Sequence, residues 1–427
     1  MLRKAGWIAA LSAVAVFGQD QRRVLTLAEA QAAALRLYPS IASASLSAQA
    51  AGEQVKQAKS GLLPLMSGNF TNVGAQADTS VSTGNVTTSS LVSRAGASGV
   101  TVSQLITDFG RTNRLIESSS LRAQAQQQRV ALSRAQVLLV VSQAYFRVQR
   151  SRSILEVARA TVGARRIVLR QVQALSESSL KSTLDVSFAE VNLSDAELTL
   201  LRAENQANAA MAELSAAMGS PGQQAFELTE EPLPPPVAGD AQSAIQAALN
   251  QRPDLAGLTL NRDSITRFAD AEKRLSLPTI SFLGAAGAVP YRETKLQGTY
   301  GAAGVNVSIP LFNGHQFSAR RGEAEFRAQA AGKDVEELAL QIARDVKVAW
   351  LETDTASHRM DLAARLLTQA EKSLRLAQSR YDLGLSTIVE FSQAQLNKTA
   401  AEMEQASSKY DYQIAVAILN YQTGAFR

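Results

Sequence analysis

The stretch Gly99-Val-Thr-Val-Ser103 returns further along the chain as Gly304-Val-Asn-Val-Ser308. The offset is 205 residues, the difference between 304 and 99. Leu121-Arg-Ala-Gln-Ala125 and Phe326-Arg-Ala-Gln-Ala330 stand at the same offset. A constant offset that persists without a gap over about 120 residues indicates a twofold internal repeat.

Upstream of this stretch the offset is 214, which relates Pro39 and Pro64 to Pro253 and Pro278. The first copy therefore carries an insertion of nine residues, the difference between the two offsets. The Ser/Thr-rich segment Asp78–Ser90 lies in this region. We predict that it forms a longer loop and that this loop is extracellular.

Proline-free sequence rich in helix-forming residues fills the downstream part of each copy, at 111–218 and 315–423. Each stretch needs one break, which we place at 176–182 in the first copy and at 382–386 in the second. Each long helix then has about 65 residues and a length of about 100 Å. No compact domain is that wide, so the sequence predicts long helical hairpins.

The second hairpin carries a coiled-coil seam, in which residues step by three and four. In the first copy Arg165 occupies one of the equivalent positions, and we expect the seam to be weaker there. The seam residues of the second copy are Leu367, Ala370, Leu374, Ala377 and Tyr381.

The hydrophobic period changes from helical to alternating between the shorter and longer helices of each copy, which predicts two strands per copy. The strands fall at 67–77, 95–105, 279–289 and 300–310. About 11 residues is the span of a tilted transmembrane strand, although ordinary soluble hairpins remain an alternative. Four strands cannot close a membrane barrel, so membrane strands would require a dimer with eight strands or a trimer with twelve.

Composition argues against catalysis. Aromatic residues make up only 5 % of the chain, which is typical of interiors packed from Ala and Leu in paired helices. The absence of cysteine excludes disulfides, thiolate metal sites, a cysteine nucleophile and a lipid anchor on cysteine. His315 and His358 have no ligand cluster around them, and no phosphate-binding loop is found. We predict no enzyme activity, no metal and no cofactor. The mild net charge of +5 gives no reason to expect nucleic acid.

Residues 1–18 have the pattern of a secretory signal peptide. Arg3 and Lys4 precede the uncharged, mostly apolar run Ala5–Phe17. No later run approaches the roughly 18 apolar residues of a membrane-spanning helix. We therefore expect an exported protein without a transmembrane helix.

The rest of the chain divides into a first repeat at 19–219, a linker at 220–239 and a second repeat at 240–427. Proline is concentrated in the linker, which we predict to contain no helix or strand. The linker prolines are Pro221, Pro232, Pro234, Pro235 and Pro236.

Together these residues resemble the TolC-like outer-membrane efflux proteins over nearly the whole mature chain. The resemblance rests on Leu25-Thr-Leu-Ala-Glu-Ala30, Val307-Ser-Ile-Pro-Leu-Phe-Asn-Gly314 and Arg380-Tyr-Asp-Leu-Gly-Leu-Ser386, among other motifs. It implies a mainly α protein with a transmembrane β part. It also implies a homotrimer with a twelve-stranded β-barrel in outer-membrane lipid and an α-barrel of twelve helices in the periplasm, with the linker in an equatorial layer. The partners implied are a periplasmic adaptor and an inner-membrane pump.

The tips of the two hairpins are the predicted gate and adaptor-docking site. Because Ser179 occupies the position equivalent to Gly384, we expect the two turns to differ in geometry. Acidic residues at the tips are solvated charges on a monomer, whereas in a trimer those facing the lumen would form charged rings. The candidate site residues are Glu177, Ser179, Asp382, Gly384, Ser386 and Thr387.

Basic residues also cluster on the first long helix. The run is read as a solvated helix face, or alternatively as an anion-attracting part of the tunnel wall. It comprises Arg147, Arg150, Arg152, Arg159, Arg165, Arg166 and Arg170.

The function predicted from these features is that of a passive exit duct in a tripartite efflux or type I secretion system. No nucleotide site is found, so the energy must come from a partner pump. Two alternatives remain at this point. One is secretion of polypeptides rather than small molecules, and the other is a periplasmic coiled-coil tether that does not conduct.

Overall fold

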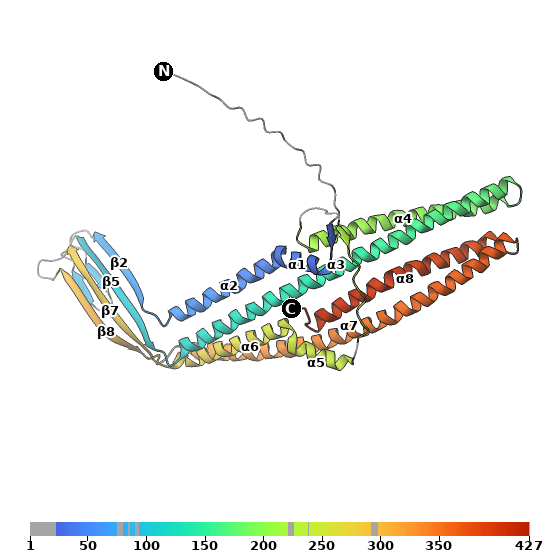
Figure 1. The fold of residues 1–427 in the computed structure, drawn as a ribbon. Coiled ribbons are helices and arrows are strands. Elements are labelled where there is room, and N and C mark those ends of the chain that lie inside the picture. Colours follow the sequence, from blue (N-terminus) through green and yellow to red (C-terminus); the bar gives the residue numbers. More distant parts are fainter. Residues whose placement is uncertain are drawn as a thin grey trace, which may run out of the picture.

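Two helices of 67 residues, α3 (Arg111–Glu177) and α7 (Gln316–Asp382), dominate the computed structural model and run through its whole helical part (Figure 1). At 1.5 Å per residue each is about 100 Å long. After a tight turn, each is followed by an antiparallel helix of 35 residues, α4 (Thr183–Ala217) or α8 (Ile388–Gln422). The predicted breaks between the long helices and their return helices are confirmed.

The structure describes only part of the chain. The predicted signal peptide lies outside the described residues, and so does part of Asp78–Ser90. The described residues are 23–74, 80–83, 86–89, 94–220, 226–237, 239–291 and 298–426.

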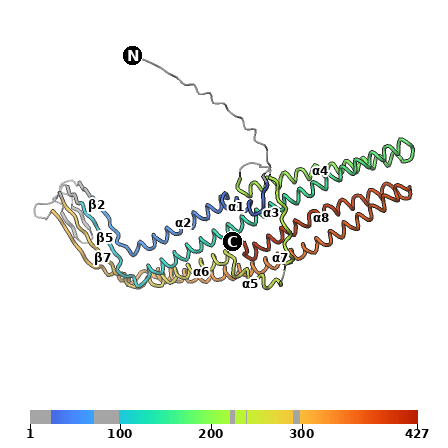
Figure 2. The backbone as a smooth tube through the Cα atoms, in the orientation of Figure 1, coloured from blue at the N-terminus to red at the C-terminus, as the bar shows by residue number. Residues whose placement is uncertain are grey.

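Shorter helices extend the bundle toward the strands. Helix α2 (Pro39–Ser60) packs on α3, as α4 does on its other half, so the two helices flank α3 end to end. In the second copy α6 (Pro253–Glu272), which continues into the 3₁₀ turn Lys273–Ser276, takes the equivalent place beside α7. Figure 2 traces the two copies as neighbouring rods along the molecule. No helix in the described part of the chain is long and apolar enough to cross a membrane.

Each copy opens with a short helix, α1 (Leu27–Leu37) or α5 (Ala241–Gln251). The Thr26 hydroxyl accepts a hydrogen bond from the Glu29 backbone N–H at 3.2 Å, and the Glu29 carboxylate accepts one from the Thr26 N–H at 3.0 Å. These reciprocal bonds satisfy two otherwise free donors at the start of α1. Thr26 and Glu29 thus form a capping box.

The bounds of the helices follow the two sequence offsets. Helices α3 and α4 begin and end 205 residues before α7 and α8, and α1 begins and ends 214 residues before α5. The change of offset falls between the strands of the first copy, where the insertion lies. Both copies therefore fold to the same helical hairpin.

Alanine forms the seams along which these helices pack. In α4 a buried alanine recurs every seven residues, and in α7 the same spacing places Ala363, Ala370 and Ala377 in the interior. A seven-residue period keeps one stripe of a helix facing its partner, and small side chains let the backbones approach closely. The predicted second-copy seam is confirmed by the burial of Ala370, Ala377 and Tyr381. The α4 series is Ala189, Ala196, Ala203, Ala210 and Ala217.

Four antiparallel strands form the sheet that extends beyond the helices, in the order β2-β5-β7-β8 (Figure 1). The pairing of β5 with β7 joins the two copies. All ten residues of β8 are exposed, including Val305 at 63 % and Val307 at 52 %. The bounds are β2 Leu65–Gly74, β5 Arg94–Thr107, β7 Thr279–Tyr291 and β8 Thr299–Ser308.

Two predictions about irregular segments are corrected. The segment predicted as a loop contains a small antiparallel pair, β3 (Ser80–Thr83) with β4 (Val86–Ser89). The linker contains β6 (Phe226–Leu228), which pairs in parallel with β1 (Arg23–Leu25). The β1–β6 pair is fixed by tertiary contacts, because the Tyr145 hydroxyl lies 3.0 Å from the Leu25 carbonyl oxygen and 2.7 Å from that of Thr229.

Candidate functional site at the helix tips

The two tip turns share one backbone geometry. Gly384 has a φ of +72°, and Ser179, its equivalent, has a φ of +61°. In both turns the next residue donates its backbone N–H to a carbonyl oxygen five residues earlier, at 2.9 and 2.8 Å. Our expectation that the turns would differ is therefore wrong. The hydrogen bonds hold Ser179 in a left-handed conformation that glycine adopts more cheaply.

Helix caps follow both turns. At the start of α4 the Ser182 hydroxyl accepts a hydrogen bond from the Leu184 N–H at 3.0 Å, and the Asp185 carboxylate accepts one from the Ser182 N–H at 3.0 Å. The Thr387 hydroxyl begins α8 by accepting a hydrogen bond from the Glu390 N–H at 3.3 Å. These side chains satisfy backbone donors that the first helical turn leaves free. Thr387 and Asp185 therefore hold the shape of the tips.

An apolar cluster joins the two hairpins just inside the turns. Its buried members are Val172 from α3, Tyr381 from α7, and Ile388 and Phe391 from α8. The rings of Tyr381 and Phe391 are stacked, with centroids 5.3 Å apart and planes 8° from parallel. Val186 of α4 packs against the cluster, so all four helices of the two hairpins contribute.

Lys181 reaches from the first turn to the second. Its Nζ lies 3.7 Å from the centroid of the Tyr381 ring and donates a hydrogen bond to the Tyr381 carbonyl oxygen at 3.3 Å. The Tyr381 hydroxyl is buried without a hydrogen-bond partner among the described residues. Burial raises the pKa of Tyr381 to about 12, and the charges of Asp185 and Asp382 act in the same direction. Tyr381 is therefore neutral at physiological pH, and its ring faces a cation.

The long helical hairpins, the exposed four-stranded sheet and the contact between the two hairpin tips are together consistent with a known family. A model of the outer membrane efflux protein family matches residues 30–220 and 244–425. The chain belongs to the outer membrane efflux protein family. As a member, it is an outer-membrane exit duct for efflux with a helical tunnel in the periplasm, and it is not an enzyme.

Curated relatives agree with this assignment. The chain is 23 % identical over 316 residues to outer membrane protein TolC of Vibrio cholerae, covering 72 % of each chain. It is 21 % identical over 393 residues to TolC of Escherichia coli, covering 88 % of this chain and 77 % of that one.

Solved structures show the same fold. A membrane protein from Pseudomonas aeruginosa has a TM-score of 0.84 at 21 % identity, with coverage of 93 % of this chain and 90 % of that one. The channel-forming protein CusC has a TM-score of 0.83 at 17 % identity, with coverage of 93 % and 92 %.

The structure groups the six predicted site residues into the two turns of this efflux protein. Glu177 and Asp382 end α3 and α7, and both are exposed without an ion pair among the described residues. Ser179 and Gly384 hold the left-handed positions, and Thr387 caps α8. The remaining residue, Ser386, has a buried Oγ without a hydrogen-bond partner in the described part of the chain.

Sequence reasoning did not include Lys181, Tyr381 or Phe391 in the site. The sequence did carry a signal for the two aromatic residues. The positions equivalent to Tyr381 and Phe391 in the first copy are occupied by Ser176 and Val186. Two aromatic residues added to one copy near the turn mark a contact that the other copy lacks. The position of Lys181 carries no comparable signal, since its contact depends on how the two hairpins pack.

The arginine run is largely paired with carboxylates. Three of its members contact glutamates of α4 at 3.7, 3.7 and 3.0 Å, and Arg150 lies 3.2 Å from Asp411 of α8. These pairs neutralise much of the positive charge and favour a paired helix surface over an anion-attracting wall. The α3–α4 pairs are Arg147–Glu213, Arg159–Glu204 and Arg166–Glu197.

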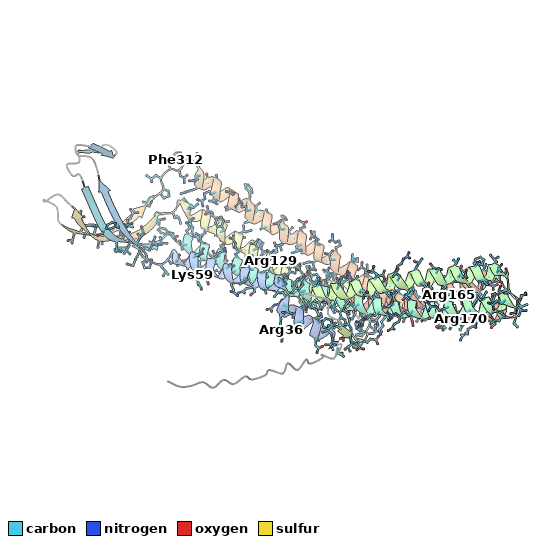
Figure 3. The ribbon with its side chains drawn as sticks, turned by 90° about the horizontal axis from the view of Figure 1, so that it is seen from above. Arg36, Lys59, Arg129, Arg165, Arg170 and Phe312 are labelled. Atoms are coloured by element: carbon cyan, nitrogen blue, oxygen red, sulfur yellow. The ribbon has the colours of Figure 1, made fainter. Side chains whose placement is uncertain are left out.

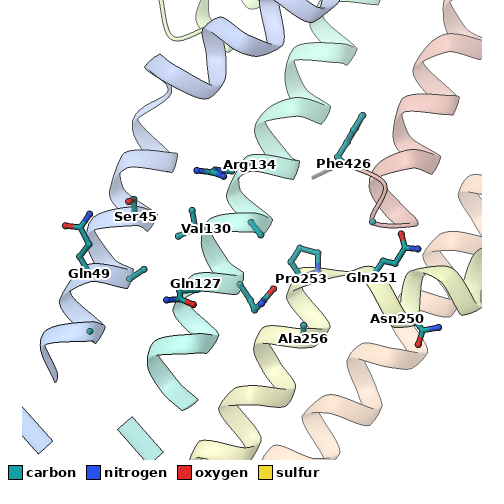
Figure 4. A pocket seen from close by; sticks show the side chains of 15 residues that line it. Ser45, Gln49, Gln127, Val130, Arg134, Asn250, Gln251, Pro253, Ala256 and Phe426 are labelled. Carbon is teal, nitrogen blue, oxygen red and sulfur yellow. The ribbon is translucent and has the colours of Figure 1, made fainter. Parts of the chain in front are cut away.

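A cavity of about 830 Å³ lies far from the tips, between α2, α3, α6 and the C-terminal residues (Figure 4). Gln49, Gln127 and Gln251 line it together with Arg134, and none of the described residues in its lining is a carboxylate or a histidine. Such a surface lacks a general acid or base. Across the described residues, no group of three His, Cys, Asp or Glu could hold a metal ion.

Proposed function

We propose that the chain assembles as a homotrimer whose hairpin tips form the periplasmic gate and the docking site for an adaptor protein. The observation that carries this proposal is the contact of Lys181 and the Tyr381–Phe391 stack, which joins the two hairpins of one chain at their free ends. Separation of the hairpins at this contact would widen the tunnel. Adaptor binding would favour the open state if the adaptor binds that state more tightly.

The sheet supports assembly. Strands β2 and β8 are the outer strands of the four, and β8 exposes apolar side chains along its length. An open sheet in lipid would leave backbone groups unpaired, so neighbouring chains must supply the missing partners. Three chains would provide twelve strands, and the apolar outer face would contact outer-membrane lipid.

A periplasmic adaptor and an inner-membrane pump are the partners in this proposal. The pump provides the energy, and the outer-membrane protein opens and closes. Membership in an efflux family favours small-molecule efflux over polypeptide secretion, and favours a conducting duct over a tether. Residues 1–18 would be removed as a signal peptide during export.

Gly384→Pro tests the docking part of the proposal. Proline fixes φ near about −65°, whereas Gly384 has a φ of +72° and donates its N–H to the Tyr381 carbonyl oxygen at 3.1 Å. The turn should break, and pump-dependent drug resistance in cells should fall. The trimer should survive, since the turn lies far from the sheet. Gly384→Asn is the matched control, because asparagine tolerates a positive φ and keeps the donor.

Asp382→Ala tests whether the Asp382 carboxylate, which has no ion pair among the described residues, lines the opening of the tunnel at the tips. Three copies of Asp382 around a narrow opening would attract cations, so their loss should shift the reversal potential of the channel in planar bilayers toward weaker cation preference. Asp382→Glu keeps the charge and should keep the potential. The proposal that the tips form the gate and docking site would be refuted by two results together. These are full drug resistance in cells with Gly384→Pro and an unchanged reversal potential for Asp382→Ala.

A further inference from the structure

Arg165 is a buried charge without a partner. It lies on the part of α3 that pairs with α4 (Figure 3), and only 4 % of its surface is exposed. No described residue forms a hydrogen bond or an ion pair with it, and its Nη1 is completely buried. The next residue, Arg166, is exposed and pairs with Glu197 at 3.0 Å.

Such a charge is unfavourable unless something compensates it. A guanidinium keeps its proton in proteins, so Arg165 cannot become neutral as a buried lysine can. Burial lowers the pKa of Arg165, and the charge of Asp195 opposes this effect. Asp195 is itself exposed and forms no ion pair with Arg165. Its charge is therefore screened by water more strongly than the charge of Arg165.

The seam does not require an arginine for packing. The repeat places Ala370 at the equivalent position of α7, where it is buried in a seam of alanines and leucines. An alanine at 165 would therefore suit the same helical geometry. The arginine adds a charge, and space for a counter-charge lies beside it.

A cavity of about 180 Å³ lies between α3, α4 and α8 with Arg165 in its wall. Thr199 of α4 and Thr399 of α8 also line it, and no described residue accepts a hydrogen bond from either hydroxyl. A water molecule occupies about 30 Å³ of liquid volume, so this cavity has room for a small ion with several waters. Its lining offers a cationic donor and two free hydroxyl donors.

We propose that this cavity binds a small monovalent anion such as chloride, held by Arg165 with the hydroxyls of Thr199 and Thr399. A singly charged ion fits better than phosphate or sulfate, because Asp195 at the same cavity repels additional negative charge. The bound ion would link α3 and α4 of one hairpin to α8 of the other. The site is lined by helices of one chain and needs no neighbouring subunit.

Bromide is a suitable probe because it replaces chloride and scatters X-rays anomalously. Crystals of the full assembled protein grown in sodium bromide should show an anomalous peak within hydrogen-bond distance of Arg165. In solution, the Tm of the detergent-solubilised protein should rise by about 1–2 °C for each tenfold increase of bromide above its Kd. Sodium gluconate at equal ionic strength should produce no such rise, because gluconate is a bulky, strongly hydrated carboxylate and not a small spherical ion.

Arg165→Met and Arg165→Ala should abolish the bromide-dependent rise in Tm. Arg170→Met is the matched control, because Arg170 is an exposed arginine of the same helix and its loss removes the same charge. This control should keep the full response. If Arg165→Met fails to fold, the anomalous map of the unaltered protein decides alone.

A direct Arg165–Asp195 ion pair with no bromide peak would overturn the proposal. An equal bromide response in the unaltered protein and in Arg165→Met would also overturn it, since the ion would then bind elsewhere.

Discussion

The hairpins α3–α4 and α7–α8 have equal lengths and the same tip turn, yet they are held together by different side chains. In the first hairpin, three arginine–glutamate pairs connect α3 to α4. Both hairpins carry an alanine seam, but the seam of the second ends in the stacked rings of Tyr381 and Phe391, and arginine–glutamate pairs, Arg359–Glu404 among them, join its two helices. The backbone geometry of the turn is thus duplicated, while the stacked aromatic rings at the tip contact between the hairpins both come from the second copy.

Among the substitutions that test this difference between the hairpins, Phe391→Ala should have the largest effect on stability and conductance. Truncation of a buried phenylalanine typically lowers the free energy of unfolding by about 3–5 kcal/mol. Because the stack lies at the free ends of the helices, part of this loss should appear as local separation of the tips. We expect greater single-channel conductance without an adaptor, together with a lower Tm.

Val186→Ala is the matched control for Phe391→Ala, since Val186 occupies the equivalent position in the first hairpin. It also packs on the tip cluster but is only partly buried. Its effect on conductance and on Tm should be clearly smaller. Equal effects of the two variants would show that the hairpins contribute equally and that the asymmetry has no functional role.

The helical framework could be predicted from sequence because its signals are local or repeated. Offsets of 205 and 214, absence of proline and a seven-residue seam are sufficient to place the long helices and their turns. The β1–β6 pair was missed because each strand has three residues and the partners are about 200 positions apart. A strand this short has too few residues to show alternation.

The positions of the tips were predicted from the sequence, but the side-chain contacts between them were not. A serine at position 179 gives no indication of a left-handed conformation, because that conformation results from hydrogen bonds of the completed turn. The expected weakness of the seam at Arg165 follows from its charge. The adjacent cavity depends on three-helix packing, which sequence periodicity does not describe.

The shared turn geometry predicts opposite effects for reciprocal substitutions. Ser179→Gly should stabilise the first turn, and Gly384→Ala should destabilise the second, each by about 1 kcal/mol. Both residues have positive φ, so the side chain is the disfavoured element in each case. Thermal unfolding of the single and double variants measures these effects. A loss of stability in Ser179→Gly would mean that the serine side chain makes a compensating contact.

The smallest predicted effect concerns acid stability of the second hairpin. Arg359 of α7 contacts Glu404 of α8 through two hydrogen bonds, at 2.5 and 3.0 Å, whereas the first hairpin has Ile154 and Thr199 at the equivalent positions. Hydrogen bonding to Arg359 lowers the pKa of Glu404 below its usual value of 4.5. The pair therefore stabilises the fold above about pH 4.5, and its contribution is lost as the pH falls through the lowered pKa.

Glu404→Gln should remove this pH-dependent contribution. Both side chains are partly exposed, at 51 % and 33 %, so the pair should contribute only about 0.2–1 kcal/mol at neutral pH. The Tm of Glu404→Gln should be slightly below that of the unaltered protein at pH 7, and the difference should disappear at low pH because both proteins then lack the charged pair. Ile154→Val provides the control in the first hairpin, where no titratable group is lost, and its Tm difference should not depend on pH. A Glu404→Gln difference that persists unchanged at low pH would show that the side chain acts through packing rather than through its charge.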